Sequence, residues 1–168
     1  MSLPVNQIIQ GDCLEVMKQW PDKCVDCVIT DPPYGINADV EQNKAAIQRI
    51  KADGKTKAGR GWKYYEPSNW DSSRPNKEVF DQMLRVSKNQ IIWGGNYFAD
   101  LLPASQGWLI WDKGQRGFSL ADGESAWTSF DKAMRIFTYS RGEALQDGRV
   151  HPTQKPVALM KWCLGLRT

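Results

Sequence analysis

The sequence predicts an α/β protein, in which a sheet carries helices on both faces and a hairpin at one edge. Strand-like runs alternate with helix-like runs along most of the chain. Residues 25–30 are almost continuously apolar, which is typical of a parallel strand buried on both faces. Residues 125–130 and 134–139 have the pattern of two strands, and a tight turn at residues 131–132 would join them as the hairpin.

The N-terminal elements follow from local signals. Residues 7–10 are predicted to form a short strand that ends at Gly11. Asp12 is a good N-cap for a helix that continues to residue 20 and stops before a proline. The strand at residues 25–30 runs directly into Asp-Pro-Pro-Tyr at residues 31–34. Two prolines cannot continue a ladder of hydrogen bonds, so the chain must turn away at the carboxyl end of this strand.

The later elements are predicted from their periodicity and from the glycines and prolines that end them. We expect helices at residues 76–86, 97–102 and 157–164, and strands at 90–93, 108–111, 125–130 and 134–139. In an open α/β sheet the ligand site lies outside the carboxyl ends of the strands. Residues 11–12, 31–34 and 94–96 are glycine-rich or polar corners at such ends, and they indicate a site on this rim.

The composition indicates one globular domain spanning residues 1–168, with a net charge of +3. This charge permits a nucleic-acid partner without requiring one, because DNA binding depends on local clusters of positive charge. No run approaches the ~20 apolar residues that cross a bilayer, and residues 1–4 lack a signal pattern. We therefore predict a cytoplasmic protein with no membrane partner.

The four cysteines suggest neither a disulfide framework nor a metal site. Cys24 and Cys27 have a C-x-x-C spacing, but residues three apart on a strand point to opposite faces. No second pair of ligands is present, and His151 is the only histidine. No metal is therefore expected, and Cys24 and Cys27 are predicted to be ordinary packing residues. Trp93, Trp108, Trp111 and Trp127 are predicted to lie in the core or a pocket wall, with stacking platforms as the alternative.

Residues 37–66 are predicted to be a flexible insertion with a helical start. The stretch is strongly basic and is followed by aromatic residues. Its candidate DNA-binding residues are Lys55, Lys57, Arg60 and Lys63, which could contact phosphates. The alternative is a solvated loop without a partner.

The motif that carries chemistry is Asp31-Pro32-Pro33-Tyr34. An ionised Asp31 accepts hydrogen bonds only, and the prolines donate none, so nearby carbonyl groups stay free to accept. Tyr34 offers a flat face for stacking. This combination suits a planar group that bears an NH2, such as the amino edge of adenine or cytosine. The alternative is an ordinary turn, because Asp-Pro begins many turns.

Five segments in one order resemble the permuted, beta-type DNA amino-methyltransferases, and most closely the short adenine-type enzymes of phages and prophages. They are IIQGDCLE (8–15), DPPYG (31–35), QIIWGGNYF (90–98), ESAWT (124–128) and HPTQKP (151–156). The resemblance covers most of the chain outside residues 37–66. It implies a Rossmann-like methyltransferase sheet, S-adenosyl-L-methionine as cofactor and double-stranded DNA as partner.

The resemblance also implies residue roles. Asp31 and the Pro32 carbonyl would hold the target amine, and Tyr34 would stack on a base that has left the duplex. Cofactor binding would fall to Asp12, Asp31, His151, Thr153, Gln154 and Lys155, although Asp12 could equally be a helix cap alone. An initial Asp in the tetrapeptide favours adenine N6 over cytosine N4 as the methylated atom.

The chain departs from the family pattern after HPTQKP. Family members continue into a strand and a glycine-rich Asp-Pro-Phe-x-Gly-x-Gly-Thr turn, and no such turn appears here. We therefore expect a sheet that is incomplete for lack of the C-terminal cofactor-binding strands, and a C-terminal truncation in some form. A missing C-terminal segment or a homodimer could complete the sheet. The competing interpretation is an inactive DNA-binding remnant of such an enzyme. The sequence does not indicate whether a restriction enzyme accompanies it.

Overall fold

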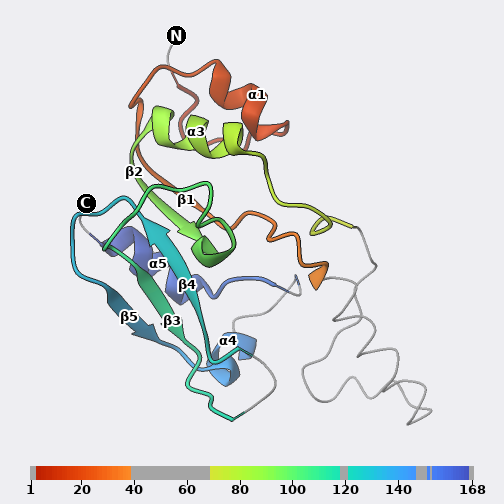
Figure 1. Ribbon diagram of the computed structural model, residues 1–168, viewed down its shortest axis with the longest axis vertical. Coiled ribbons are helices and arrows are strands. Elements are labelled where there is room, and N and C mark those ends of the chain that lie inside the picture. The colour runs from red at the N-terminus through yellow and green to blue at the C-terminus, as the bar shows by residue number, and fades with distance from the viewer. Residues whose placement is uncertain (1–2, 39–68, 118–120, 147–150, 152, 167–168) are drawn as a thin grey trace.

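The computed structural model describes residues 3–38, 69–117, 121–146, 151 and 153–166, and their core is a five-stranded mixed sheet (Figure 1). The strand order is β1-β2-β4-β3-β5. The strands are β1 (Val25–Thr30), β2 (Ser87–Trp93), β3 (Leu109–Asp112), β4 (Gly123–Thr128) and β5 (Arg135–Thr138). β1 runs parallel to β2, and β3 runs parallel to β5. β4 is antiparallel to both β2 and β3.

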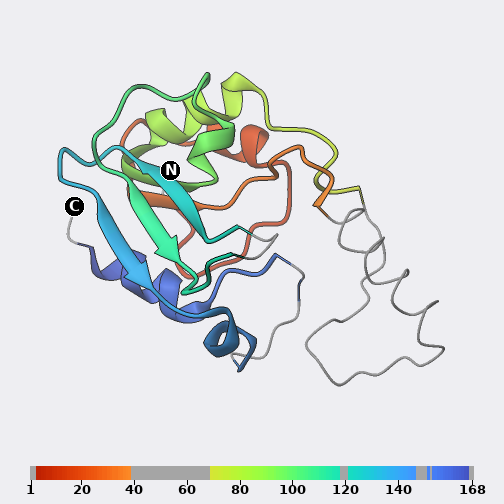
Figure 2. The same ribbon diagram turned by 60° about the horizontal axis from the view of Figure 1, so that its bottom comes forward.

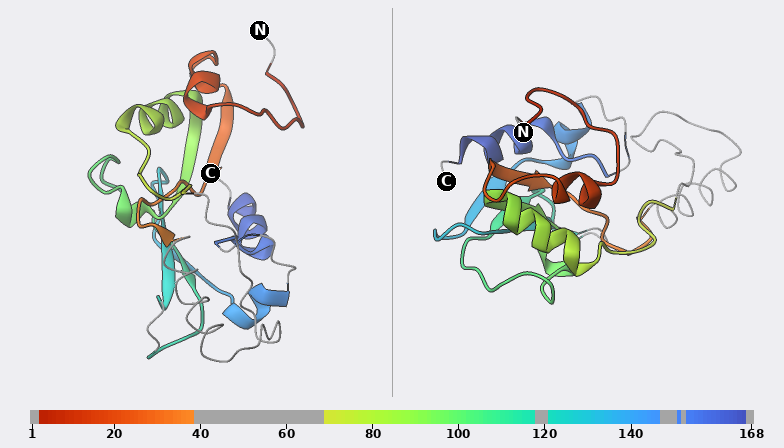
Figure 3. Two further views of the ribbon diagram at one scale, coloured as in Figure 1. Left: turned by 90° about the vertical axis from the view of Figure 1, so that its right-hand side faces the viewer. Right: turned by 90° about the horizontal axis from the view of Figure 1, so that it is seen from above.

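Helices cover both faces of this sheet, as predicted (Figures 2 and 3). α1 (Cys13–Lys18) and α3 (Lys77–Val86) pack on one face, and α5 (Val157–Gly165) packs on the other. Successive side chains of β2 point to opposite faces of the sheet, so the core has two parts. Ile92 packs on the side of α3, and Ile91 and Trp93 pack on the side of α5. All three side chains are fully buried, and each such burial contributes roughly 1.5–3 kcal/mol.

The ends of α1 and α3 are fixed by side-chain hydrogen bonds. Asp12 caps α1 by accepting from the backbone N–H groups of Leu14 at 2.8 Å and Glu15 at 3.3 Å, and Asn76 caps α3. Arg85 of α3 donates to the carbonyl groups of Met17 and Trp20, both at 2.7 Å. The Met17 carbonyl also accepts from the Trp20 N–H at 3.0 Å. The two bonds from Arg85 therefore add to the backbone bonds at the end of α1 and hold the two helices together.

Two strand predictions were wrong. Residues 7–10 form no strand, and Ile8 is fully exposed. A strand needs a neighbour for its backbone groups, and residues 7–10 have none among the described strands. The predicted edge hairpin of 125–130 with 134–139 is also absent. Both sides of β4 are already paired with β2 and β3, so β5 lies at the free side of β3. The hairpin in this sheet is β3–β4 instead.

The helical predictions differ from the structure at two places. Residues 97–102 do not form a helix, and the region holds only a 3-10 turn, η1 (Gly95–Tyr97). The helix α4 (Arg141–Gln146) was not predicted. The helices predicted at 76–86 and 157–164 are confirmed as α3 and α5.

The packing predicted for Cys24, Cys27 and the four tryptophans is found in the structure. Cys24 packs with the α1 and α3 side of the core, and Cys27 packs with the α5 side. All four cysteines are free, and the four predicted tryptophans lie in the two apolar clusters. Within the described ranges, no helix is both long and apolar enough to cross a membrane. The predicted DNA-contacting residues Lys55, Lys57, Arg60 and Lys63 lie outside the described residues.

A candidate site at the carboxyl end of strand β1

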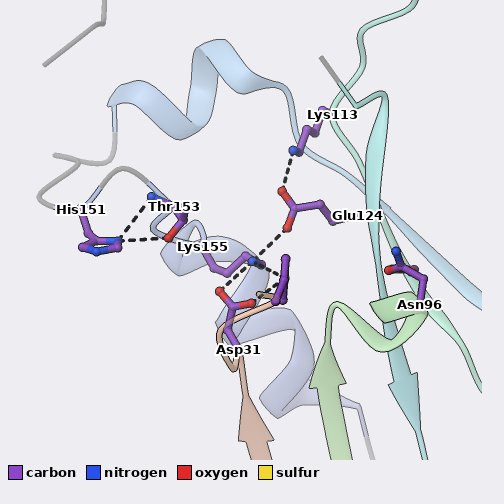
Figure 4. Close-up of polar contacts among 9 residues, drawn as sticks. Asp31, Asn96, Lys113, Glu124, His151, Thr153 and Lys155 are labelled. Atoms are coloured by element: carbon purple, nitrogen blue, oxygen red, sulfur yellow. Dashed lines mark hydrogen bonds and ion pairs between the residues drawn. The ribbon is translucent and has the colours of Figure 1, made fainter. Parts of the chain in front are cut away.

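The tetrapeptide at residues 31–34 follows β1 directly, as predicted. β1 and β2 are parallel and β4 is antiparallel to β2, so β4 begins at the rim where β1 and β2 end. One rim of the sheet therefore carries Asp31, the turn that begins at Gly94, and Glu124 near the start of β4. Figure 4 shows Asp31 and Glu124 there, with Lys155 between them.

The carboxylate of Asp31 is held at both of its oxygens. Oδ1 accepts a hydrogen bond from the Tyr34 hydroxyl at 2.7 Å, and Oδ2 accepts one from Lys155 Nζ at 2.7 Å (Figure 4). Lys155 Nζ also lies 3.2 Å from the Tyr34 hydroxyl. The side chain of Asp31 is still 31% exposed. A carboxylate has about four lone-pair sites, so Asp31 keeps acceptor capacity on its exposed side.

Glu124 completes a cluster of four charges. Its Oε2 lies 2.9 Å from Lys155 Nζ, and its Oε1 lies 2.6 Å from Lys113 Nζ. Burial alone would raise the pKa of Glu124, but the two lysine ammonium groups outweigh it and lower the pKa below its ordinary value. Glu124 is therefore ionised at neutral pH, and two carboxylates balance two ammonium groups in the cluster.

Tyr34 is enclosed rather than open. Its ring stacks on Tyr97 with 4.7 Å between the centroids and meets the edge of Phe98. Burial, followed by the negative charges of Asp31 and Glu124, raises the pKa of the Tyr34 hydroxyl. The hydroxyl therefore keeps its proton and acts as the donor to Asp31. Gly94 lies so close that a Cβ there would overlap the Tyr34 ring.

The chain that leaves the tetrapeptide is fastened by Asp71, which is 1% exposed. Asp71 accepts from the backbone N–H of Gly35 at 2.8 Å and from that of Ala38 at 2.9 Å. Its own carbonyl accepts from Asn37 N–H at 3.0 Å. A carboxylate that receives backbone N–H groups makes charge-assisted, short bonds. Asp71 therefore fixes the direction in which the chain leaves Tyr34.

The segment before α5 brings the other predicted residues to the rim. His151 Nδ1 lies 3.1 Å from the Thr153 hydroxyl, and the His151 carbonyl accepts from Gln154 N–H at 3.2 Å (Figure 4). The His151 ring also meets the ring of Trp70 edge-on, with 5.3 Å between the centroids. Gln154 and Lys155 follow in the same segment.

The structure thus brings Asp31, Tyr34 and Lys155 into direct contact, with Pro32 buried and Pro33 half-buried between the first two. Asp12 has no hydrogen bond or ion pair to this cluster among the described contacts, and it serves as the cap of α1. Sequence reasoning missed Lys113, Glu124, Asp71 and Tyr97. An acidic residue inside an otherwise half-buried strand was the available signal for Glu124, because a buried charge requires a partner.

Comparisons with known proteins add no identity to this picture. No protein-family model matches the chain, and no curated protein matches it. Among the described residues, no group of His, Cys, Asp and Glu side chains is placed to hold a metal ion. The function must therefore be argued from the rim itself.

The rim offers one carboxylate that a cation or an N–H donor from solvent could reach. Asp31 presents a partly exposed carboxylate, and the His151 to Lys155 segment lies beside it. Glu124 is committed to two lysines. Among the described residues of the cluster, Asp31 is thus the carboxylate that remains accessible to a ligand.

Proposed function

We propose that this chain is an S-adenosylmethionine-dependent DNA methyltransferase that acts on an exocyclic amine, with N6 of adenine as the favoured target. The observation that carries the proposal is the state of Asp31. Its two oxygens are oriented by Tyr34 and Lys155, while its side chain keeps one exposed side at the rim. A carboxylate prepared in this way is an acceptor for an N–H donor that arrives from solvent.

An aromatic amine is a poor nucleophile because its lone pair is delocalised into the ring. Asp31 would accept one N–H, and the Pro32 carbonyl would accept the other, which favours a pyramidal nitrogen with a free lone pair. Positioning of this kind supplies much of the rate in a direct transfer. The target base must leave the duplex, at a cost of a few kcal/mol. After transfer, Asp31 is the nearest group to receive the amine's surplus proton.

When bound, S-adenosylmethionine supplies the methyl group. His151, Thr153 and Gln154 are the described residues that would hold it beside Asp31, and Asp12 is the remaining candidate; Lys155 is already engaged by Asp31, Tyr34 and Glu124. Tyr34 has one neighbour, Tyr97, stacked on its ring already. A base that stacks on Tyr34 would therefore extend or open this aromatic pair.

The test is methyl transfer from radiolabelled S-adenosylmethionine to unmethylated double-stranded DNA by the chain and by Asp31→Ala. We expect incorporation by the parent chain and a loss of at least about a hundredfold in the variant. Asp26→Ala is the matched control, because Asp26 lies on β1, the strand that leads to Asp31, in an exposed pair with Lys88, and such pairs contribute little.

Analysis of the methylated nucleosides distinguishes the two bases. N6-methyladenine supports the favoured target, whereas N4-methylcytosine replaces it. DNA binding without incorporation refutes the enzyme and supports the non-catalytic remnant. Equal incorporation by the parent chain and Asp31→Ala refutes the role given to Asp31.

A further inference from the structure

Lys155 is the most buried charged side chain of the rim, with 7% of its side chain exposed. Its ammonium lies within 3.2 Å of three oxygens, which belong to Asp31, Tyr34 and Glu124. A lysine has three N–H donors and no acceptor. Asp31 and the Tyr34 hydroxyl accept hydrogen bonds from this ammonium, and Glu124 Oε2 forms an ion pair with it. Three contacts therefore hold the ammonium.

Glu124 needs this lysine as much as Asp31 does. The Oε2 atom of Glu124 is buried and has no hydrogen-bond partner among the described residues, so the ammonium at 2.9 Å balances its charge. Removing Lys155 from the cluster would leave two carboxylates without the cation between them. Breaking a buried ion pair by taking away one partner is strongly destabilising, so Lys155 stays in place when the exposed side of Asp31 binds a ligand.

The three connected groups come from separate parts of the chain. Asp31 follows β1, Glu124 lies on β4, and Lys155 precedes α5. β1 and β4 are not neighbours, because β2 lies between them. A lysine side chain is a flexible four-carbon stem, so its ammonium needs an anchor on each side to hold one position. Lys113, 2.6 Å from the far oxygen of Glu124, fixes that anchor in turn.

We propose that Glu124 is a positioning residue for methyl transfer: it anchors Lys155, and Lys155 orients the Asp31 carboxylate that receives the target amine. Glu124 has this role without touching the base. The inference rests on the proposed function, since it assigns the amine to Asp31. The part of the inference in which Glu124 orients Asp31 through Lys155 is independent of what Asp31 binds.

The first experiment measures transfer kinetics for Glu124→Gln, which keeps the size of the side chain and removes its charge. We expect kcat to fall by about 10- to 100-fold, as a misplaced reacting group does, with KM for DNA unchanged. Glu78→Gln is the matched control, because Glu78 lies on α3 in an exposed pair with Lys18. Glu124→Asp keeps the charge and should recover part of kcat.

The second experiment needs no catalysis. The Lys155 ammonium of the parent chain should give an NMR signal protected from exchange with water, and the Asp31 carboxyl carbon should give a single sharp signal. Glu124→Gln should remove the first signal and shift the second, and Glu78→Gln should leave both unchanged. If the glutamine variant does not fold, Glu124→Asp should give a smaller change of both signals in the same direction, because its shorter side chain keeps the charge but moves it away from Lys155.

The outcomes separate the two proposals. Unchanged Lys155 and Asp31 signals in the Glu124 variants overturn the inference, whether or not the chain is active. Changed signals with an unchanged kcat in an active chain overturn it as well. If the parent chain transfers no methyl group, the proposed function fails, and the Asp31 signal still decides whether Glu124 positions that carboxylate.

Discussion

Replacing Gly94 with alanine is the most direct test of how the aromatic part of the site is built. Gly94 follows β2 with a φ of +73°, in the left-handed region that favours glycine. A Cβ at this position would overlap the Cε1 atom of Tyr34 and lie 2.5 Å from Cζ. The ring cannot easily withdraw, because its hydroxyl is bonded to Asp31 and its face is stacked on Tyr97.

Two costs add in this variant. A non-glycine residue in the left-handed region costs roughly 1–2 kcal/mol, and forcing an extra carbon into a packed position costs about 1–3 kcal/mol. We therefore expect Gly94→Ala to lower the free energy of unfolding by about 2–5 kcal/mol, which is a large part of the ~5–15 kcal/mol that stabilises a domain. Tyr34 should also lose its hydrogen bond to Asp31.

Gly117→Ala is the matched control. Gly117 has the same φ of +73°, and no described residue lies within 4 Å of the position that a Cβ would take there. Only the backbone cost of roughly 1–2 kcal/mol applies to it. The difference between the two variants therefore measures the clash with Tyr34, and it should be about 1–3 kcal/mol.

Urea unfolding of both variants and of the parent chain, followed by circular dichroism, gives these differences from the midpoints and slopes. A Gly94→Ala, Tyr34→Ala double variant should lose less stability than the sum of the two single variants, because the clash disappears with the ring. Equal losses for Gly94→Ala and Gly117→Ala, or full additivity in the double variant, would refute the close packing of Gly94 against Tyr34.

Three further predictions concern single groups. Asp71→Asn should lower the free energy of unfolding by about 1–3 kcal/mol, because an amide replaces a buried acceptor of two backbone N–H groups; urea unfolding checks this. Arg116 donates to both oxygens of Asp112 and lowers the pKa of that carboxyl, which should therefore titrate by NMR at about 2 instead of 3.8. Its stabilising effect is present above pH 3.8 and should be lost as the pH falls toward 2. Burial raises the pKa of Cys163 from 9.0 to about 11, so this thiol should react with a disulfide reagent far more slowly than exposed Cys13. Its contribution to stability is present below pH 9 and should be lost as the pH rises toward 11.

Features specified by neighbouring residues could be predicted from the sequence. Three such features are the cap at Asp12, the strand that ends just before Asp31, and the opposite faces of Cys24 and Cys27. Each depends on a few adjacent positions, and each is found in the structure. The missed helix α4 also had a local signal. Ser140 and Glu143 form a reciprocal capping box, with Ser140 N–H donating to Glu143 at 2.8 Å.

Strand pairing could not be predicted in the same way, because it depends on which edges are already taken. The apolar pattern of residues 134–139 predicted a strand correctly, but nothing near it in the sequence shows that β4 has a partner on each side. Glu124 was missed for a related reason. Its importance depends on Lys155, which is close in space and not in sequence.

The contrast between local contacts and contacts distant in the sequence also decides how the Asp-Pro-Pro-Tyr motif is interpreted in this chain. In an ordinary turn the carboxylate of Asp31 would cap backbone N–H groups nearby or face water. Here it binds the hydroxyl of Tyr34 and a nearly buried ammonium whose other anchor is Glu124 on a strand two positions away. A turn has no need of such a distant partner, and keeping ionised groups out of water is costly unless they are paired. The arrangement is therefore better explained as a carboxylate held ready for a ligand, and the Glu124 variants test that explanation directly.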